Sequence, residues 1–302
     1  MTNPSSDKAV VIAAYGRRVT LLLDDGRNVS ARIRGRKLQA VCGDRVLATP
    51  IPDEPDWLIE AIEPRDNELT RPNMRGKIEI LASNLSLLAA VSADPPQPDW
   101  YIIDRYLCAA ELMRIDAIVV FNKADDGRMP DAYRDELENY QRIGYTAITC
   151  SAVSGARMDE LAAALSTSTS IITGQSGVGK STLINALTGG KQRTADVSTS
   201  SGEGRHTTVT AVMLPLPNGG SVIDSPGVRD YAPAIDTPAD VEHGFREIRE
   251  TGLQCRFSDC RHRHEPGCAV KAAVFDNKIS ERRYESFRRM LGMTEKHEQS
   301  RY

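Results

Sequence analysis

The pattern of apolar and polar residues changes along the chain, and in residues 1–65 it is typical of short strands. Short apolar stretches end at Gly16, Gly35, Gly43 or the Asp25-Gly26 hairpin signal. Strands are therefore expected at residues 10–14, 18–23, 28–33, 44–49 and 57–62. Five short strands in this length favour a small β-barrel with the oligonucleotide/oligosaccharide-binding (OB) fold. The pattern does not distinguish a ligand-binding barrel from one that only packs against its neighbour.

Residues 64–76 (PRDNELTRPNMRG) are polar and contain turn-forming residues, so a linker is expected there. Beyond residue 80, buried strands alternate with helices. Strands are expected at 85–92, 115–121, 146–150, 170–173 and 221–223, and helices at 101–113, 133–143, 158–165 and 181–187. The stretch at 85–92 is almost wholly apolar, as in a parallel sheet that is covered on both faces. This alternation predicts a doubly wound α/β domain.

The C-terminal part is expected to be helical at residues 241–251 and 279–291, with a cluster of cysteine and histidine residues between the two helices. In the last helix, one face is expected to be apolar and the remainder to offer a basic surface made by Arg282, Arg283, Arg288 and Arg289. Three domains follow: an OB barrel over residues 1–68, a nucleotide domain over 69–235 and a helical metal-binding domain over 236–302.

Composition describes a soluble globular protein. Of 302 residues, 40% are apolar and 26% are charged, and no apolar run is long enough to span a membrane. The first residues lack the apolar core of a secretory signal, so the expected location is the cytoplasm. Cys42, Cys108 and Cys150 are scattered and are expected to be small buried residues.

Charge is unevenly distributed along the chain. The net charge of −3 argues against a wholly basic nucleic-acid binder. Only residues 241–302 are net basic, with 13 Lys/Arg against 10 Asp/Glu. In the barrel, Arg32, Arg34, Arg36 and Lys37 form a local basic cluster. Either region, taken alone, is most simply a solvated charged face.

A phosphate-loop pattern follows the strand expected at 170–173. Its glycines let successive backbone N–H groups converge on a phosphate, and the following helix N-terminus adds partial positive charge. In this pattern Lys180 reaches the β- and γ-phosphate oxygens, and the Ser181 hydroxyl binds Mg²⁺. The nucleotide-binding residues expected here are Gly174, Gln175, Ser176, Gly177, Val178, Gly179, Lys180, Ser181 and Thr182.

A guanine-reading motif follows an earlier strand. Asn122, Lys123 and Asp125 have the Asn-Lys-x-Asp spacing, and Ser151 with Ala152 forms the companion base loop after the next strand. The Asp125 carboxylate accepts hydrogen bonds from guanine N1–H and its 2-amino group, whereas adenine offers neither donor, which disfavours an ATPase. The base reader precedes the phosphate loop, the reverse of the usual order, so the α/β domain is expected to be circularly permuted.

The γ-phosphate sensor has the Asp-x-x-Gly form. Asp224 is expected to hold Mg²⁺ through water, and the Gly227 N–H to meet the γ-phosphate. Either Thr207 or Thr208, in a Gly/Ser-rich switch at 198–208, supplies the second hydroxyl to Mg²⁺. Val228 stands where many GTPases place the glutamine that orients water, so intrinsic hydrolysis is expected to be slow. His206 is the nearest catalytic candidate, or a solvated loop histidine.

The cysteine cluster has the composition of a structural zinc site. Cys255, Cys260, His262 and Cys268 supply three thiolates and one imidazole, a closed tetrahedral set. His264 is an alternative fourth ligand. A zinc deaminase is excluded because neither the His-x-Glu nor the Pro-Cys-x-x-Cys element is present.

Together, the permuted motifs, the preceding barrel and the following Cys/His site resemble the bacterial family of ribosome small-subunit-dependent GTPase A. The resemblance extends over residues 10–291 and implies a slow GTPase, stimulated by the small (30S) subunit and acting late in its assembly. It implies 16S rRNA contacts through the barrel and the metal-binding domain, one structural Zn²⁺, and Mg²⁺ with GTP. We expect a monomer that binds GTP and GDP, with neither DNA nor a membrane as partner.

Two other functions remain open from the sequence. One is a nucleotide-gated rRNA-binding factor in which hydrolysis is incidental. The other is a GTPase of large-subunit assembly, which the barrel and the metal site disfavour. In either case the γ-phosphate sensor leads almost directly into the metal-binding domain, so nucleotide state is expected to act on that domain through the chain that joins them.

Overall fold

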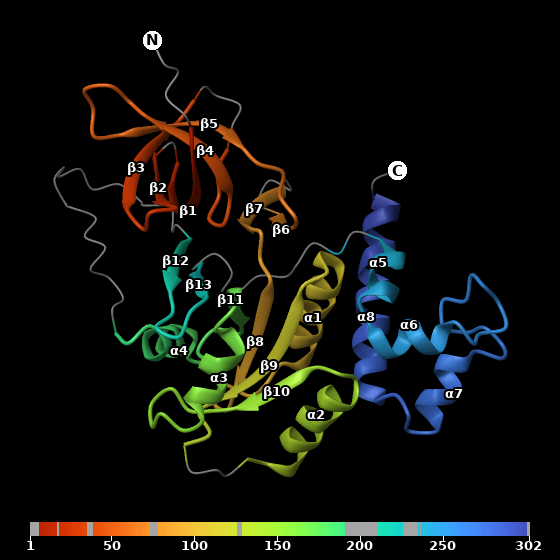
Figure 1. Ribbon diagram of the computed structural model, residues 1–302. Coiled ribbons are helices and arrows are strands. Elements are labelled where there is room, and N and C mark those ends of the chain that lie inside the picture. The colour runs from red at the N-terminus through yellow and green to blue at the C-terminus, as the bar shows by residue number, and fades with distance from the viewer. Residues whose placement is uncertain are drawn as a thin grey trace.

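Three parts make up the molecule: a barrel, a parallel sheet with helices, and a C-terminal group of helices (Figure 1). The structure is a computed structural model and describes residues 6–16, 18–34, 39–72, 78–125, 129–190, 211–225, 235 and 237–300. Among these residues, no helix has the length and apolar character needed to cross a membrane.

The N-terminal strands close into a five-stranded barrel, as expected. They are β1 (Asp7–Tyr15), β2 (Arg18–Leu23), β3 (Asn28–Ile33), β4 (Arg45–Pro50) and β5 (Trp57–Ile62). The order is β1-β2-β3-β5-β4, with β1 also paired to β4 and with β3 and β5 parallel. Alternate residues point inward, so that Val11, Leu21 and Ile59 are fully buried.

The linker expected at residues 64–76 is wrong in part, because a strand begins inside it. β6 (Glu68–Pro72) pairs antiparallel with β7 (Ile78–Ser83) as a separate two-stranded sheet. The reason is that Leu69 and Ala82 are buried against the core of the nucleotide domain. One buried side chain in a polar stretch is too weak a signal to outweigh the charged and turn-forming residues around it.

The nucleotide domain is a mostly parallel sheet with helices on both faces. Its strands are β8 (Leu87–Ala93), β9 (Asp116–Asn122), β10 (Thr146–Thr149), β11 (Thr169–Gly174), β12 (Val212–Pro215) and β13 (Ser221–Asp224). Its helices are α1 (Trp100–Met113), α2 (Asp131–Arg142), α3 (Met158–Leu165) and α4 (Lys180–Leu187). Among these six strands, the short antiparallel strand β12 was not predicted, because none of its four residues is fully buried. β7 was not predicted either.

The permutation is visible in the strand order β10-β9-β8-β11-β13-β12. β11, which leads into the phosphate loop, lies at the centre of this sheet between β8 and β13. Within the nucleotide domain, β8, β9 and β10 precede β11 in sequence and lie on one side of it, whereas β12 and β13 follow it and lie on the other. The expected doubly wound sheet, with the base-reading strands before the phosphate-loop strand in the chain, is therefore confirmed.

The barrel is joined to the nucleotide domain by a buried carboxylate. Asp44 has no exposed surface and accepts hydrogen bonds from Arg65 (2.6 and 2.9 Å) and from the Ser83 hydroxyl (2.6 Å). Its neighbour Gly43 has a φ of 96°, and a Cβ there would lie 2.1 Å from the Ser83 carbonyl oxygen. In addition, β1 pairs with β12 at Ala13 and Val212, so barrel and parallel sheet form one eleven-stranded sheet.

The C-terminal domain contains α5 (Pro238–His243), α6 (Arg246–Gly252), α7 (Ala269–Phe275) and α8 (Glu281–Ser300). The single helix expected at 241–251 is therefore wrong, because the helix is interrupted between α5 and α6. Phe245 lies at the break, fully buried and 5.6 Å from the Phe287 ring. Gly244 lets the break approach α1, since a Cβ there would lie 2.0 Å from Cys108 Sγ. The short helix α7 was not predicted.

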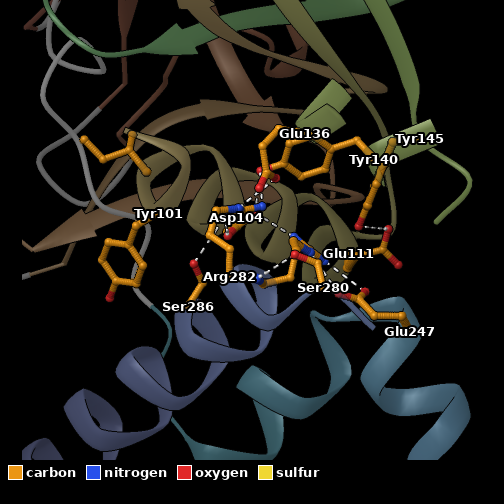
Figure 2. A network of polar contacts seen from close by, with 12 residues as sticks. Tyr101, Asp104, Glu111, Glu136, Tyr140, Tyr145, Glu247, Ser280, Arg282 and Ser286 are labelled. Carbon is orange, nitrogen blue, oxygen red and sulfur yellow. Dashed lines mark hydrogen bonds and ion pairs between the residues drawn. The ribbon is translucent and has the colours of Figure 1, made fainter. Parts of the chain in front are cut away.

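The basic surface expected on the last helix is also wrong for two of its four members. Arg283 is fully buried and binds Asp104 of α1. Arg282 is largely buried and binds the same carboxylate (Figure 2). Arg288 pairs with Glu285 on its own helix, and Arg289 lies 3.9 Å from the Tyr101 ring centroid. The partners of the two buried arginines come from distant parts of the chain, which a helical pattern does not reveal.

We predict that Asp44→Ala destabilises the barrel by about 1–3 kcal/mol, because Arg65 Nε and the Ser83 hydroxyl lose their acceptor, while Arg65 keeps its pair with Glu68. Urea unfolding followed by Trp57 fluorescence in a Trp100→Phe background measures this, since these are the two tryptophans of the chain. Glu54→Ala, which removes an exposed pair with Arg32, is the control and should leave the midpoint unchanged. Equal midpoints for both variants would contradict the assigned role of Asp44.

Candidate functional site

The phosphate loop lies at the carboxyl end of β11, at the edge where ligands of parallel sheets bind. Gly174 has a φ of 140°, and a Cβ there would lie 2.1 Å from the Val91 carbonyl oxygen. The Lys180 ammonium donates to the Gly174 and Gln175 carbonyl oxygens at 2.6 and 2.5 Å. Its positive charge is thereby held inside the curve of the loop, where a phosphate group is bound in this motif.

Asn122 joins the base-reading loops to the phosphate loop. Its side-chain amide donates to the Val178 carbonyl oxygen (2.9 Å) and accepts from the Ala152 N–H (3.1 Å). Gly179 allows this approach, since a Cβ there would lie 2.5 Å from Asn122 Nδ2. Segments that are distant in sequence therefore meet at one edge, in the arrangement expected for them.

Asp125 is oriented by the companion base loop. The Ser151 hydroxyl, which is fully buried, donates to the Asp125 carboxylate. The same oxygen accepts from the N–H groups of Val153 (3.3 Å) and Ser154 (3.1 Å), so its proton is directed to Asp125. The Asp125 carboxylate is therefore held by the companion base loop.

Lys123 lies across the same edge. Its ammonium donates to the Pro95 and Gly177 carbonyl oxygens, both at 2.7 Å. The segment that follows β8 is thereby held against the phosphate loop. Ser176, Ser181 and Thr182 belong to the loop and the first turn of α4, as the pattern requires.

Asp224 is the last residue of β13, the strand next to β11 in the sheet. It therefore reaches the same edge as the phosphate loop. Gly227 and Val228 lie outside the described residues, as do His206, Thr207 and Thr208. The catalytic and Mg²⁺-binding roles assigned to these five residues remain predictions.

Four side chains of the C-terminal domain form a metal-binding group. The ligand atoms of Cys255, Cys260, His262 and Cys268 all lie within 4.8 Å of one another. Cys255 Sγ lies 3.9 Å from Cys268 Sγ, and both sulfur atoms lie 3.5 Å from His262 Nδ1. A zinc tetrahedron has edges of about 3.8 Å between sulfur atoms and about 3.6 Å between sulfur and nitrogen. The donor set therefore fits Zn²⁺.

The surroundings of His262 favour this set over the alternative with His264. The His262 ring is buried, with Nε2 3.6 Å from a Glu242 carboxylate oxygen, a partner that metal-binding histidines commonly have. Gly252 packs closely against the ring, and a Cβ at this position would lie only 3.2 Å from the ring atoms. His264 is exposed and lies outside the group, so it is not the fourth ligand.

Glu265 fixes the loop that carries these ligands. Its carboxylate accepts from the backbone N–H groups of Arg261 (3.0 Å), Arg263 (2.8 Å) and His264 (3.0 Å). Burial works against ionisation of Glu265, but these donors outweigh it and lower the pKa to about 2. Sequence reasoning missed both Glu265 and Glu242 because neither belongs to a ligand motif.

The basic cluster of the barrel is partly neutralised. Arg32 binds Asp56 (2.8 Å) and Glu54 (2.6 Å), and Arg34 binds Glu60 (2.6 Å). Arg36 and Lys37 lie outside the described residues. For Arg32 and Arg34, the structure agrees with a paired, solvated surface.

Comparisons with known proteins agree on one family. A model of the RsgA GTPase family matches residues 62–233. The small ribosomal subunit biogenesis GTPase RsgA of Pseudomonas aeruginosa is 41% identical over 284 residues, which cover 93% of this chain and 84% of that protein. The protein of the same name from Mannheimia succiniciproducens is 36% identical over 300 residues, covering 97% of this chain and 85% of that protein.

Solved structures agree with these relatives. YjeQ from Thermotoga maritima superposes with a TM-score of 0.77 at 31% identity, covering 96% of this chain and 98% of that one. YloQ, described as a circularly permuted GTPase, gives a TM-score of 0.75 at 22% identity, covering 97% and 96%, and supports the fold.

We predict that the purified chain carries about one zinc ion, bound by three thiolates and one imidazole. Cys260→Ala should lose this ion, because it opens the tetrahedron, while the matched variant His264→Ala should retain it. Elemental analysis of both proteins measures the difference. Zinc loss from His264→Ala at the level of Cys260→Ala would contradict the ligand assignment.

Proposed function

Because this chain belongs to the RsgA GTPase family, we propose that it hydrolyses GTP to GDP and phosphate during biogenesis of the small ribosomal subunit. The observation that carries this proposal is the meeting of the base reader with the phosphate loop, through Asn122 and the Val178 carbonyl oxygen at 2.9 Å. This contact lies in a chain 41% identical to a small ribosomal subunit biogenesis GTPase.

Each residue at this edge has a proposed part in nucleotide binding. Asp125, oriented by Ser151, accepts from guanine N1–H and the 2-amino group, which selects GTP over ATP. Lys180 and the backbone N–H groups of residues 174–182 bind the phosphates. The Ser181 hydroxyl and Asp224 would hold Mg²⁺, together with Thr207 or Thr208. When bound, this ion would neutralise charge that develops on the transferred phosphoryl group.

Hydrolysis is proposed to be slow without a partner. Val228 offers no hydrogen bond to the attacking water, whereas many GTPases have a glutamine at that position. We propose that His206 orients the water when the small subunit is bound, with the Gly227 N–H directed to the γ-phosphate.

The relatives of this chain suggest its partners. The relatives are named for biogenesis of the small ribosomal subunit, which supports the 30S subunit as partner. We propose further that the barrel and the C-terminal domain contact its 16S rRNA, and that the chain acts as a cytoplasmic monomer. The domain boundaries 1–68, 69–235 and 236–302 belong to the same proposal. A role in large-subunit assembly is disfavoured, since the relatives carry the name of the small subunit.

We predict that purified small subunits raise GTP turnover by roughly tenfold or more, as a partner that completes a catalytic site does. Large subunits, and ATP in place of GTP, are the controls and should give no stimulation. His206→Ala should lower stimulated turnover to near the unstimulated rate and leave GDP affinity unchanged. Phosphate release under saturating GTP measures each case.

Unstimulated turnover in the presence of small subunits would contradict the assigned function. It would favour instead the rRNA-binding factor in which hydrolysis is incidental. Full stimulation of His206→Ala would contradict only the role of that histidine.

A further inference from the structure

Helix α1 belongs to two cores at once. Ile103, Tyr106 and Leu107 are buried against the parallel sheet, in the core of the nucleotide domain. Cys108 is buried on another face of the helix, in the core of the C-terminal domain. Figure 1 shows α1 standing between the strands of the sheet and helix α8. A displacement of the C-terminal domain therefore acts on a helix of the nucleotide domain.

Asp104 fixes α1 to α8. Its carboxylate has no exposed surface and accepts from Arg282 (2.5 Å), Arg283 (2.8 Å) and the Tyr140 hydroxyl (2.6 Å). Figure 2 shows Asp104 at the centre of these contacts, with Arg282 approaching from α8 and Tyr140 from the other side. Arg282 also binds Glu136 of α2 at 2.8 Å.

A second set of contacts lies two turns along the same face of α1. Glu111 accepts from Arg246 of α6 (2.6 Å) and from the Tyr145 hydroxyl (3.2 Å). Arg246 also stacks 4.0 Å from the Tyr145 ring centroid. With contacts at both positions, the C-terminal domain holds α1 against rotation as well as translation.

The N-terminal end of α1 reaches the phosphate loop. The Asp99 N–H donates to Gln175 Oε1 at 2.9 Å. The Asp99 carboxylate in turn caps the helix by accepting from the N–H groups of Tyr101 (3.1 Å) and Ile102 (3.3 Å). Gln175 therefore ties the phosphate loop to the first turn of α1.

The distance between the two attachments is short. Asp99 and Asp104 are separated by about 7.5 Å along a helix axis, less than two turns. A helix segment of this length moves as a rigid body. The position of α8 is therefore transmitted to the residue that hydrogen bonds the phosphate loop.

We propose that Gln175 is a positioning residue through which docking of the C-terminal domain on α1 sets the geometry of the phosphate loop, and with it nucleotide affinity. The proposal rests on the proposed nucleotide site. It adds a route through packed residues to the covalent route expected from the sequence, which runs through residues 226–234, outside the described part of the chain.

A double-mutant cycle on the free full-length protein tests this route. The variants are Gln175→Met, which keeps the side-chain length but removes the acceptor, Arg282→Ala, and the two combined. Fluorescent GDP titration should show weaker binding for each single variant. In the double variant the combined loss should fall short of the product of the single losses by about threefold or more, as coupled residues require.

The control lies on the same helix. Arg288→Ala removes a contact made only within α8, to Glu285 at 3.2 Å, so its effect should multiply with that of Gln175→Met. Arg282→Lys keeps a positive charge at Asp104 and should recover part of the GDP affinity. It replaces Arg282→Ala in the cycle if that variant does not fold. Losses that multiply within twofold for Gln175→Met and Arg282→Ala would overturn the proposal. If Lys180→Ala bound GDP as tightly as the wild-type protein does, the proposed nucleotide site would be contradicted instead.

Discussion

The buried carboxylate of Asp104 fixes the C-terminal domain to the nucleotide domain. Burial alone raises the pKa of Asp104, but the charges of Arg283 and Arg282 outweigh it and hold this pKa below its ordinary value. Arg283 is itself fully buried and needs a second carboxylate, which Glu247 supplies through two hydrogen bonds of 2.8 and 2.9 Å. Any slide of α8 along α1 would separate these charges where water does not replace them, so the two domains meet in one arrangement.

The barrel is attached by the same physical means. Asp44, also fully buried, is bound by Arg65 and by Ser83 of the nucleotide domain. The permutation makes this arrangement possible, because it places the barrel before β8 and the C-terminal helices after β13. Both appended domains therefore contact the nucleotide domain directly, and in each attachment a carboxylate without exposed surface accepts the hydrogen bonds. Such contacts specify geometry more than they add stability.

Sequence predicted the parts of this structure that depend on local pattern. The strands at residues 18–23, 28–33 and 57–62 were placed to the residue, because alternation and turn residues are local. The Cys255 to Cys268 site followed from ligand spacing. The burial of Arg283 was not predictable, since its partners Asp104 and Glu247 lie 179 and 36 residues away in the sequence. The break at Phe245 depends in the same way on the distant Cys108 and Phe287.

If α1 is shared by both cores, nucleotide binding must change the local stability of α8. Hydrogen exchange of the full-length protein, with and without saturating GDP, measures this directly. The account predicts slower exchange in α1 and in the first turns of α8, beside the phosphate loop and α4, because ordering of the loop is transmitted through Asp99 and Asp104. Slower exchange confined to the nucleotide site, with α8 unchanged, would contradict it.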